Sequence, residues 1–225
     1  MEAAETKTSM SLPTRLLKVF FAPGEVFEAV RAKPVWFGAL GMAGLFVALS
    51  MVLIPGEIWI ESMRAQAAEQ GTEMPGFMSS AGPVFRLASA ASAMIGTFLW
   101  AFLLAGIVTL VFAFLFGDDG KYRQYLSVVS HALFIGAVGA LLLIPLRIAQ
   151  GDPSLTLNLS TFLPFLEEGY SLRVLKLLDL FGLWSYLVMA VGVTKIDPRR
   201  GMGFAVSFFM AFAVVFALIF GIFGG

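Results

Sequence analysis

The stretch FFAPGEVFEAVRAKPVWFGAL, residues 20–40, leads from a short charged segment directly into a long apolar run. That run, residues 35–54, has about the 20 apolar residues that a helix rising about 1.5 Å per residue needs to cross a bilayer. The whole chain has the same character: 59% of its 225 residues are hydrophobic, 13% are charged, and the mean hydropathy is +0.88. Soluble domains carry about 25% charged residues. The composition therefore predicts an integral membrane protein.

The charge balance and the lack of cysteine exclude several classes of protein. Fifteen basic and fifteen acidic residues leave no net charge, whereas nucleic-acid binding depends on a basic surplus. Without cysteine there is no disulfide, no thiolate metal site and no cysteine nucleophile. The first 34 residues contain no uninterrupted apolar core beside a small-residue cleavage site, so we expect no signal peptide.

Five apolar runs are candidate membrane spans: residues 35–54, 87–116, 126–146, 177–193 and 204–223. The second run is longer than the hydrocarbon core requires and must tilt, kink or project. The fourth run is short and marginal. We expect an all-α integral membrane helical bundle with five transmembrane helices over residues 35–225, preceded by N-terminal amphipathic interfacial helices in residues 1–34.

The basic residues of the loops predict the orientation. One side carries ten: Lys7, Arg15, Lys18, Arg31, Lys33, Lys121, Arg123, Lys195, Arg199 and Arg200. The other side carries five: Arg64, Arg86, Arg147, Arg173 and Lys176. The excess predicts a cytoplasmic N-terminus and a C-terminus outside.

The N-terminal segment has two amphipathic stretches separated by Pro23 and Gly24. In residues 11–21, apolar residues recur at helical spacing while Arg15 and Lys18 point away. The second stretch, EVFEAVRA, ends before Pro34. This pattern is typical of helices that lie in the membrane interface, either as simple anchors or as a cytoplasmic docking surface.

Small residues at intervals of four predict where helices pack closely in lipid. The second span carries Ala88, Ser92 and Gly96, followed by Ala101, Ala105, Thr109, Ala113 and Gly117. The third span carries Ala132, Gly136 and Ala140. We expect these two helices to form the central pair. The phenylalanine-rich fifth span is expected to face lipid or to form an oligomer seam.

Ionisable residues inside spans are costly and frequently functional. His131 lies in the third span, where it either satisfies a bundle contact or relays a proton. Asp179 opens the fourth span at the level of Arg86 and Arg147. We expect a salt bridge from Asp179 to one of these arginines, the alternative being that the three line an outward-facing polar cavity.

Catalytic motifs are absent from the sequence. EEGYSLR, residues 167–173, is similar to the paired-glutamate motif of intramembrane prenyl-type proteases, but its arginine is displaced and a single histidine does not build the metal site. No GxSxG, HExxH or phosphate-binding glycine loop occurs. Asp118 and Asp119 of GDDG are expected in a solvated turn. We expect no enzyme activity, no cofactor and no metal.

The segment 151–176 is more apolar than a solvated loop. We expect an interfacial helix over the bundle, or alternatively a re-entrant hairpin.

Three segments of the chain resemble the Yip-domain family, named for its Ypt/Rab-interacting eukaryotic members: APGEVFEAVRAKPVW, GDDGKYRQYLSVVSHALF and DLFGLWSYLVMAVGVTKIDPRRGMGFAV. The matching residues are Pro23, Phe27, Pro34, Gly117, Gly120, Tyr122, Tyr125 and Trp184. The Asp-Leu-Tyr-Gly-Pro segment of eukaryotic members is absent, and His131 replaces an expected aromatic residue. Rab binding is therefore not transferred.

The resemblance implies a non-enzymatic, multi-pass protein of the bacterial inner membrane, in a family that acts in membrane organisation and trafficking. We expect a scaffold that contacts the lipid bilayer and a protein partner, with homo-oligomerisation left open. Its partner face would be cytoplasmic and include Arg15, Lys18, Phe27, Lys121, Arg123, Arg199 and Arg200. The alternatives are a transporter or channel for a small solute, ion or lipid, and an accessory subunit of a larger membrane complex.

Overall fold

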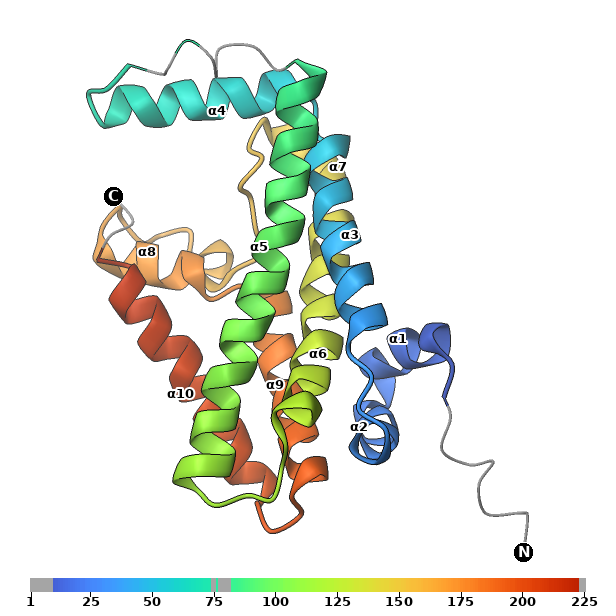
Figure 1. Cartoon of the computed structure of the whole chain (residues 1–225). Helices are drawn as coiled ribbons and strands as arrows, with labels where there is room; N and C mark the ends of the chain where they lie inside the picture. Colours follow the sequence, from blue (N-terminus) through green and yellow to red (C-terminus); the bar gives the residue numbers. More distant parts are fainter. Residues whose placement is uncertain (1–9, 74–75, 77–81, 223–225) are drawn as a thin grey trace, which may run out of the picture.

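The computed structural model describes residues 10–73, 76 and 82–222 (Figure 1). The first nine residues of the predicted N-terminal segment and Phe223 of the fifth predicted span lie outside this range. Within it, the chain forms helices and a single isolated bridge between Asn158 and Asp179, and no strand. The predicted all-α helical bundle is confirmed.

The helix α6 (Tyr122–Leu142) lies at the centre of the bundle. It packs against α3 (Phe37–Leu53), α5 (Pro83–Thr109) and α9 (Leu180–Ile196). Glycines allow this close approach: a Cβ added to Gly192 would overlap Val128, and one added to Gly139 would overlap the ring of Phe181. The second and third predicted spans do pack together, but the centre is α6 alone, because α3 and α9 pack on it more extensively than α5 does.

The five predicted spans correspond to α3, to α5 with the π-helix η2 (Leu110–Leu115), to α6, to α9 and to α10 (Met202–Phe220). Three of them, Pro83–Leu115, Tyr122–Leu142 and Met202–Phe220, are long and apolar enough to cross a membrane. Helix α3 is long enough to cross a membrane only when it is taken together with α4, from which it is bent by 85°. Helix α9 is a shorter apolar helix of 17 residues. Length and composition thus support three or four spans among the described residues.

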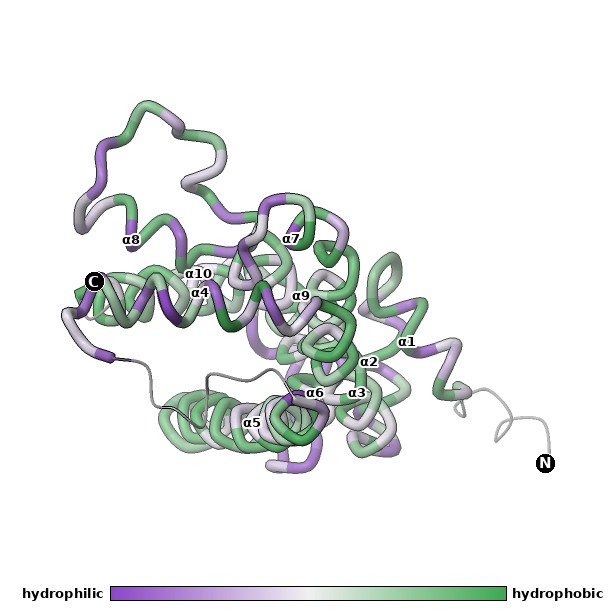
Figure 2. The backbone as a smooth tube through the Cα atoms, turned by 90° about the horizontal axis from the view of Figure 1, so that it is seen from above, coloured by the Kyte–Doolittle hydropathy of each residue, from purple (hydrophilic) through white to green (hydrophobic). Residues whose placement is uncertain are grey.

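The helix α4 (Gly56–Glu69) follows α3 after the bend and lies across one end of the bundle (Figure 1). Viewed from that end, α5 is mostly hydrophobic, whereas α4 alternates between hydrophilic and hydrophobic residues (Figure 2). The apolar runs of the sequence did not include this segment, whose Glu57, Glu61 and Glu69 make it acidic. It is nevertheless a helix with a buried side, formed by Gly56 and Ile60.

The N-terminal helices α1 (Leu12–Phe21) and α2 (Pro23–Ala32) lie at the predicted stretches, except that α2 begins at Pro23 and so includes the predicted break; both pack against the bundle itself. Leu16 and Val19 of α1 are buried, and α2 buries Phe27 against α6 and α9. Their apolar faces therefore contact protein where the sequence suggested lipid. The exposed side chains of Leu17 and Phe21 lie on the outer side of α1.

Of the two tracks of small residues predicted on α5, the second agrees with the structure at Ala101 and Ala105, which are buried, and the first does not. Ala88, Ser92 and Gly96 are exposed, so their assignment to the helix interface is wrong for contacts within the chain. The buried face consists of Ala90, Ala101, Leu104, Ala105 and Val108. On α6, Ala132 is buried while Gly136 and Ala140 are half-buried. Four-residue spacing of small residues thus identified the buried face in one half of α5 and not in the other.

The segment 151–176 continues from α7 (Ile144–Gln150) and contains the 3-10 helix η3 (Leu159–Phe162) and the start of α8 (Tyr170–Leu177). The Tyr170 hydroxyl donates to the Leu218 carbonyl at 2.7 Å, and Arg173 Nε donates to the Gly221 carbonyl at 3.0 Å. These bonds hold α8 across the end of α10 (Figure 1).

Candidate functional site

The loops that join α5 to α6 and α9 to α10 meet at the end of the bundle that also carries α1 and α2 (Figure 1). We call residues 116–121 and 197–201 the loop cluster. Gly117 has a φ of 71°, in the left-handed region that favours glycine. The turn returns Asp118 beneath α5, where its backbone N–H donates to the Phe112 carbonyl at 2.9 Å.

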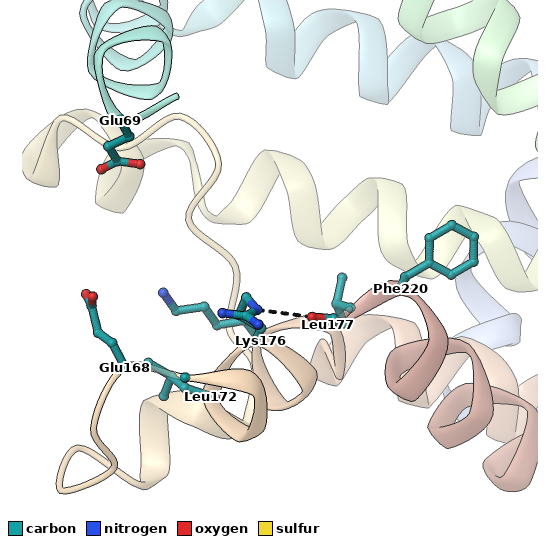
Figure 3. A pocket seen from close by; sticks show the side chains of 9 residues that line it. Glu69, Glu168, Leu172, Lys176, Leu177 and Phe220 are labelled. Carbon is teal, nitrogen blue, oxygen red and sulfur yellow. Dashed lines mark hydrogen bonds between the residues drawn. The ribbon is translucent and has the colours of Figure 1, made fainter. Parts of the chain in front are cut away.

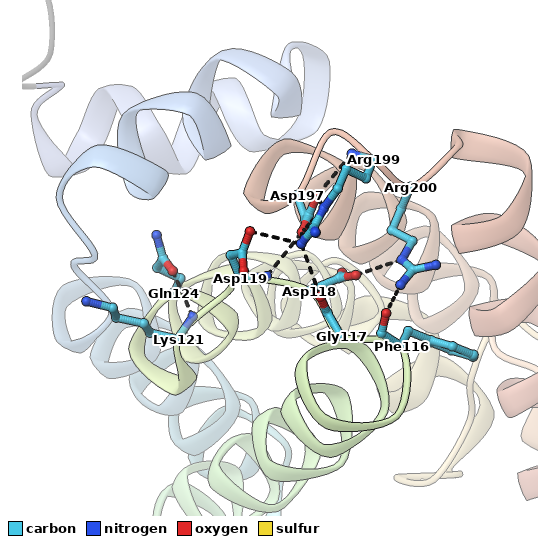
Figure 4. Close-up of polar contacts among 9 residues, drawn as sticks. All are labelled: Phe116, Gly117, Asp118, Asp119, Lys121, Gln124, Asp197, Arg199 and Arg200. Carbon is cyan, nitrogen blue, oxygen red and sulfur yellow. Dashed lines mark hydrogen bonds and ion pairs between the residues drawn. The ribbon is translucent and has the colours of Figure 1, made fainter.

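Asp118 and Arg200 form the buried ion pair of the loop cluster (Figure 4). The Asp118 side chain is completely buried and accepts from Arg200 Nε at 2.6 Å. Arg200 also donates to the Phe116 carbonyl, and its guanidinium lies over the rings of Phe116 and Phe204, 5.2 and 5.9 Å from the centroids. Arg200 is thereby fixed by both a charge and two aromatic faces.

Asp197 and Arg199 form the second half of the loop cluster. Arg199 Nε donates to both oxygens of Asp197 at 2.9 and 3.0 Å. The same guanidinium reaches Asp119 Oδ2 at 3.0 Å and the Gly117 carbonyl at 3.1 Å, while Asp119 N–H donates to Asp197 at 3.1 Å. The Arg199 hydrogen bonds hold the pKa of Asp197 well below its usual range. The two loops are thus joined across about 80 residues of sequence.

The expectation that Asp118 and Asp119 occupy a solvated turn is wrong for Asp118 and correct for Asp119. Asp119 has a side chain 93% exposed, whereas that of Asp118 is 0% exposed. A signal for this was available. The predicted orientation placed GDDG and IDPRR on the same side of the membrane, and each contains the charges that the other can pair.

Two polar groups lie buried beneath the loop cluster, Asp118 Oδ2 and the Tyr125 hydroxyl. Neither has a hydrogen bond of ordinary geometry to a described residue, but the two side chains interact electrostatically with each other. A Cβ on Gly120 would overlap the Tyr125 side chain, so only glycine leaves room for this tyrosine.

The predicted partner-face residues have different surroundings. Phe27 is fully buried, so its assignment to a partner surface is wrong. Arg15 is half-buried and donates to the Met10 carbonyl at 3.2 Å, and Lys18 pairs with Glu25 at 2.5 Å. Arg199 and Arg200 belong to the loop cluster described above.

Lys121 and Arg123 are exposed and lie beside the end of α2, where Gln124 Nε2 donates to the Arg31 carbonyl at 2.9 Å. Arg31 and Lys33 are exposed there as well. We call Arg31, Lys33, Lys121 and Arg123 the basic patch. Among the residues that the structure describes, none of the four forms an ion pair.

His131 is fully buried on α6 and packs edge-on against Phe27, with 6.5 Å between ring centroids. Its Nδ1–H donates to the Ser127 carbonyl at 2.7 Å. The remaining ring nitrogen, Nε2, has no partner within the described part of the chain.

Asp179 and Arg147 line one small cavity of about 90 Å³, together with Gly136, Ala140 and Phe181. Asp179 caps α9 by accepting from Gly182 N–H at 2.8 Å, and Arg147 Nε donates to the Leu155 carbonyl at 2.9 Å. No ion pair joins Asp179 to an arginine in the described ranges, so the predicted salt bridge is wrong. The capping role had a sequence signal, an aspartate directly before an apolar helix.

Arg86 lies apart from that cavity, at the junction of α3, α4 and α5, and donates to the Val52 carbonyl. His131, Arg86 and the Arg147–Asp179 pair therefore occupy three different places. At the α4 end there is also an open groove of about 570 Å³, lined by charges of both signs from Glu69, Glu168 and Lys176 and by the apolar Leu172 and Phe220 (Figure 3). Over the described residues, no group of three or more histidine or acidic side chains is placed to hold a metal ion.

Long apolar helices around a central helix, with charges confined to the ends and a few buried sites, define a multi-pass helical membrane protein. The Yip1 domain family matches residues 17–222, and the chain belongs to this family. It is 24% identical over 191 residues to the membrane protein YknW of Bacillus subtilis (strain 168). The matched region covers 80% of this chain and 77% of YknW. It is a bacterial Yip-domain protein. No solved structure matches the chain significantly.

Proposed function

We propose that this protein is a non-catalytic scaffold of the bacterial inner membrane that binds the acidic segment of a partner protein at its basic patch. In this arrangement the N-terminus is cytoplasmic and the C-terminus lies outside, as the ten basic residues against five predict. The observation that carries the proposal is the absence of any acidic partner for Arg31, Lys33, Lys121 and Arg123 in the described structure.

The surroundings of the basic patch support binding of a partner because they are already fixed. The buried ion pair of Asp118 with Arg200 holds the turn before Lys121, and the Gln124 bond to Arg31 ties α2 to the start of α6. A preorganised surface loses less conformational entropy on binding than a flexible one. Four like charges on it favour an acidic segment and raise the association rate.

A transport function receives less support. Its polar residues would have to line one continuous wet path, whereas His131 packs on Phe27 and Arg86 lies away from Arg147 and Asp179. An accessory subunit of a larger membrane complex agrees with the scaffold proposal. In that case the exposed apolar side chains of α10 would be available as a second contact.

The proposal is tested by replacing Arg123 with a photo-crosslinking residue in native membranes, with Arg64 on α4 as the matched site at the opposite end. We expect one protein partner to crosslink from position 123 and not from position 64. The charge reversals Lys121→Glu and Arg123→Glu should abolish its co-purification, while Arg64→Glu should not.

Deleting residues 11–33 would be a poor test, because it removes the buried Val19, Val26 and Phe27 together with the surface. Crosslinks from position 123 to lipid alone would mean that the basic patch attracts anionic headgroups instead. That result, or a partner retained after both charge reversals, would contradict the proposed function.

A further inference from the structure

Arg86 has an unusual environment at the junction of α3, α4 and α5. It lines two neighbouring cavities of about 300 and 260 Å³. The larger one lies in the angle between α3 and α4 and is walled mainly by Met51, Trp59, Met63 and Phe85. The smaller one adds Val52, Pro83 and Leu87. Among the described residues that line these two largely apolar cavities, Arg86 is therefore the one that is charged.

The charge of Arg86 is not compensated within the described structure. Its guanidinium donates to the Val52 carbonyl, its Nε is buried without a partner, and no described carboxylate forms an ion pair with it. A guanidinium offers five N–H donors. Leaving a charge in apolar surroundings is costly unless it is paired. The geometry calls for an anion at the guanidinium and apolar groups along the cavity wall.

We propose that Arg86 and these cavities form a binding site for an anionic lipid, with the headgroup at Arg86 and one acyl chain against Trp59, Met63 and Phe85. The larger cavity lies at the lower end of the size range of ligand pockets, which suits one chain and not the whole body of a two-chain lipid. Both a fatty-acid carboxylate and the phosphate of an anionic phospholipid have this chemistry.

Trp59 supplies the measurement, because bromine atoms on a bound chain quench a nearby indole. The purified full chain in mild detergent is titrated with dibromostearate, at a pH at which the acid is ionised, and with the corresponding brominated alcohol. We expect saturable quenching by the acid at a concentration about tenfold or more below that of the alcohol, because only the acid pairs with the guanidinium. Trp59→Phe should remove the saturable part.

Variants assign the effect to Arg86. In Arg86→Gln, the acid should saturate the quenching only at the concentration that the alcohol needs. Arg86→Lys should keep most of the preference for the acid over the alcohol, and Arg64→Gln on α4 should leave that preference unchanged. Phosphatidylglycerol with a brominated chain, compared with phosphatidylcholine, identifies the source. Dependence on Arg86 for phosphatidylglycerol indicates a membrane phospholipid, and dependence for the fatty acid alone indicates a free acid.

Equal saturation by acid and alcohol in the unmodified chain overturns the site, even when Arg86→Gln does not fold. Unchanged preference in a folded Arg86→Gln protein overturns it as well.

Discussion

All five ion pairs between described residues lie at the loop-cluster end of the bundle, whereas Arg86, Arg147 and Arg173 at the opposite end donate to main-chain carbonyls. At the first end, these pairs lock two loops together, and the basic charges left uncompensated include the exposed ones of the basic patch. At the second, a carbonyl orients each arginine without cancelling its charge. The difference separates an end fixed by ion pairs from an end where partly or wholly buried arginines keep uncompensated charges.

The largest effect is expected from Phe27→Ala at the loop-cluster end. Phe27 is completely buried against α6 and α9, so its truncation should lower the free energy of unfolding by about 4 kcal/mol. The matched control is Phe21→Ala, whose side chain is 86% exposed and whose loss should cost less than about 0.5 kcal/mol. Denaturant titration in detergent micelles measures both. Equal losses of stability in Phe27→Ala and Phe21→Ala would contradict the burial of Phe27.

The next effect tests the buried pair. Asp118→Asn leaves Arg200 without its counter-charge and should destabilise the fold by about 3 kcal/mol. Asp119→Asn, at a side chain 93% exposed, should cost less than about 1 kcal/mol. The double variant Asp118→Leu with Arg200→Met should be more stable than Asp118→Leu alone. If it is less stable, the pair is not the origin of the effect.

A pH titration tests the second half of the loop cluster. Because Arg199 lowers the pKa of folded Asp197, this carboxylate contributes stability above its unfolded pKa of about 3.9, and the contribution is lost as the pH falls through the folded value. Tm should therefore drop as the pH is lowered below about 4. Asp197→Asn should have a lower Tm at neutral pH, equivalent to a loss of roughly 2 kcal/mol in the free energy of unfolding. Its Tm should also fall less steeply as the pH is lowered. If Tm falls equally with decreasing pH in the unmodified protein and in Asp197→Asn, other carboxylates cause the loss of stability in acid.

The smallest effect is expected at the α4 end. Arg173→Gln removes the bond from Nε to the Gly221 carbonyl and no ion pair, so the free energy of unfolding should fall by only about 1 kcal/mol. Arg173→Lys serves as the control that keeps the charge but not the geometry. A loss as large as that of Asp118→Asn would remove the contrast between the two ends.

The sequence was sufficient for the features that depend on local pattern. Apolar length indicated the five helices, and the helical spacing of apolar residues indicated both N-terminal helices, although it left Phe27 assigned to a partner surface. Periodicity could not predict whether the apolar faces of these two helices contact lipid or protein, because both environments favour the same apolar face. Helix α4 was missed since its acidic residues outweighed a narrow apolar side.

Features that depend on tertiary contacts were predicted less well. The ion pair of Asp118 with Arg200 joins residues 82 positions apart, and only the relative placement of two loops reveals it. Gly96 has nothing within 4 Å of an added Cβ, whereas Gly192, which no packing prediction included, meets Val128. The contacts of a glycine depend on which neighbour its helix faces.

The helices of this bundle differ greatly in length. Helix α9, with 17 residues, rises about 25 Å, while the continuous stretch Pro83–Leu115, with 33, would rise roughly 50 Å if upright. Lipids around the molecule thus meet a hydrophobic belt of uneven height, and the bilayer must thin beside α9 or the long helix must lean. We expect the protein's stability to vary with acyl-chain length in reconstituted vesicles, and a flat response would show that tilting absorbs the whole difference.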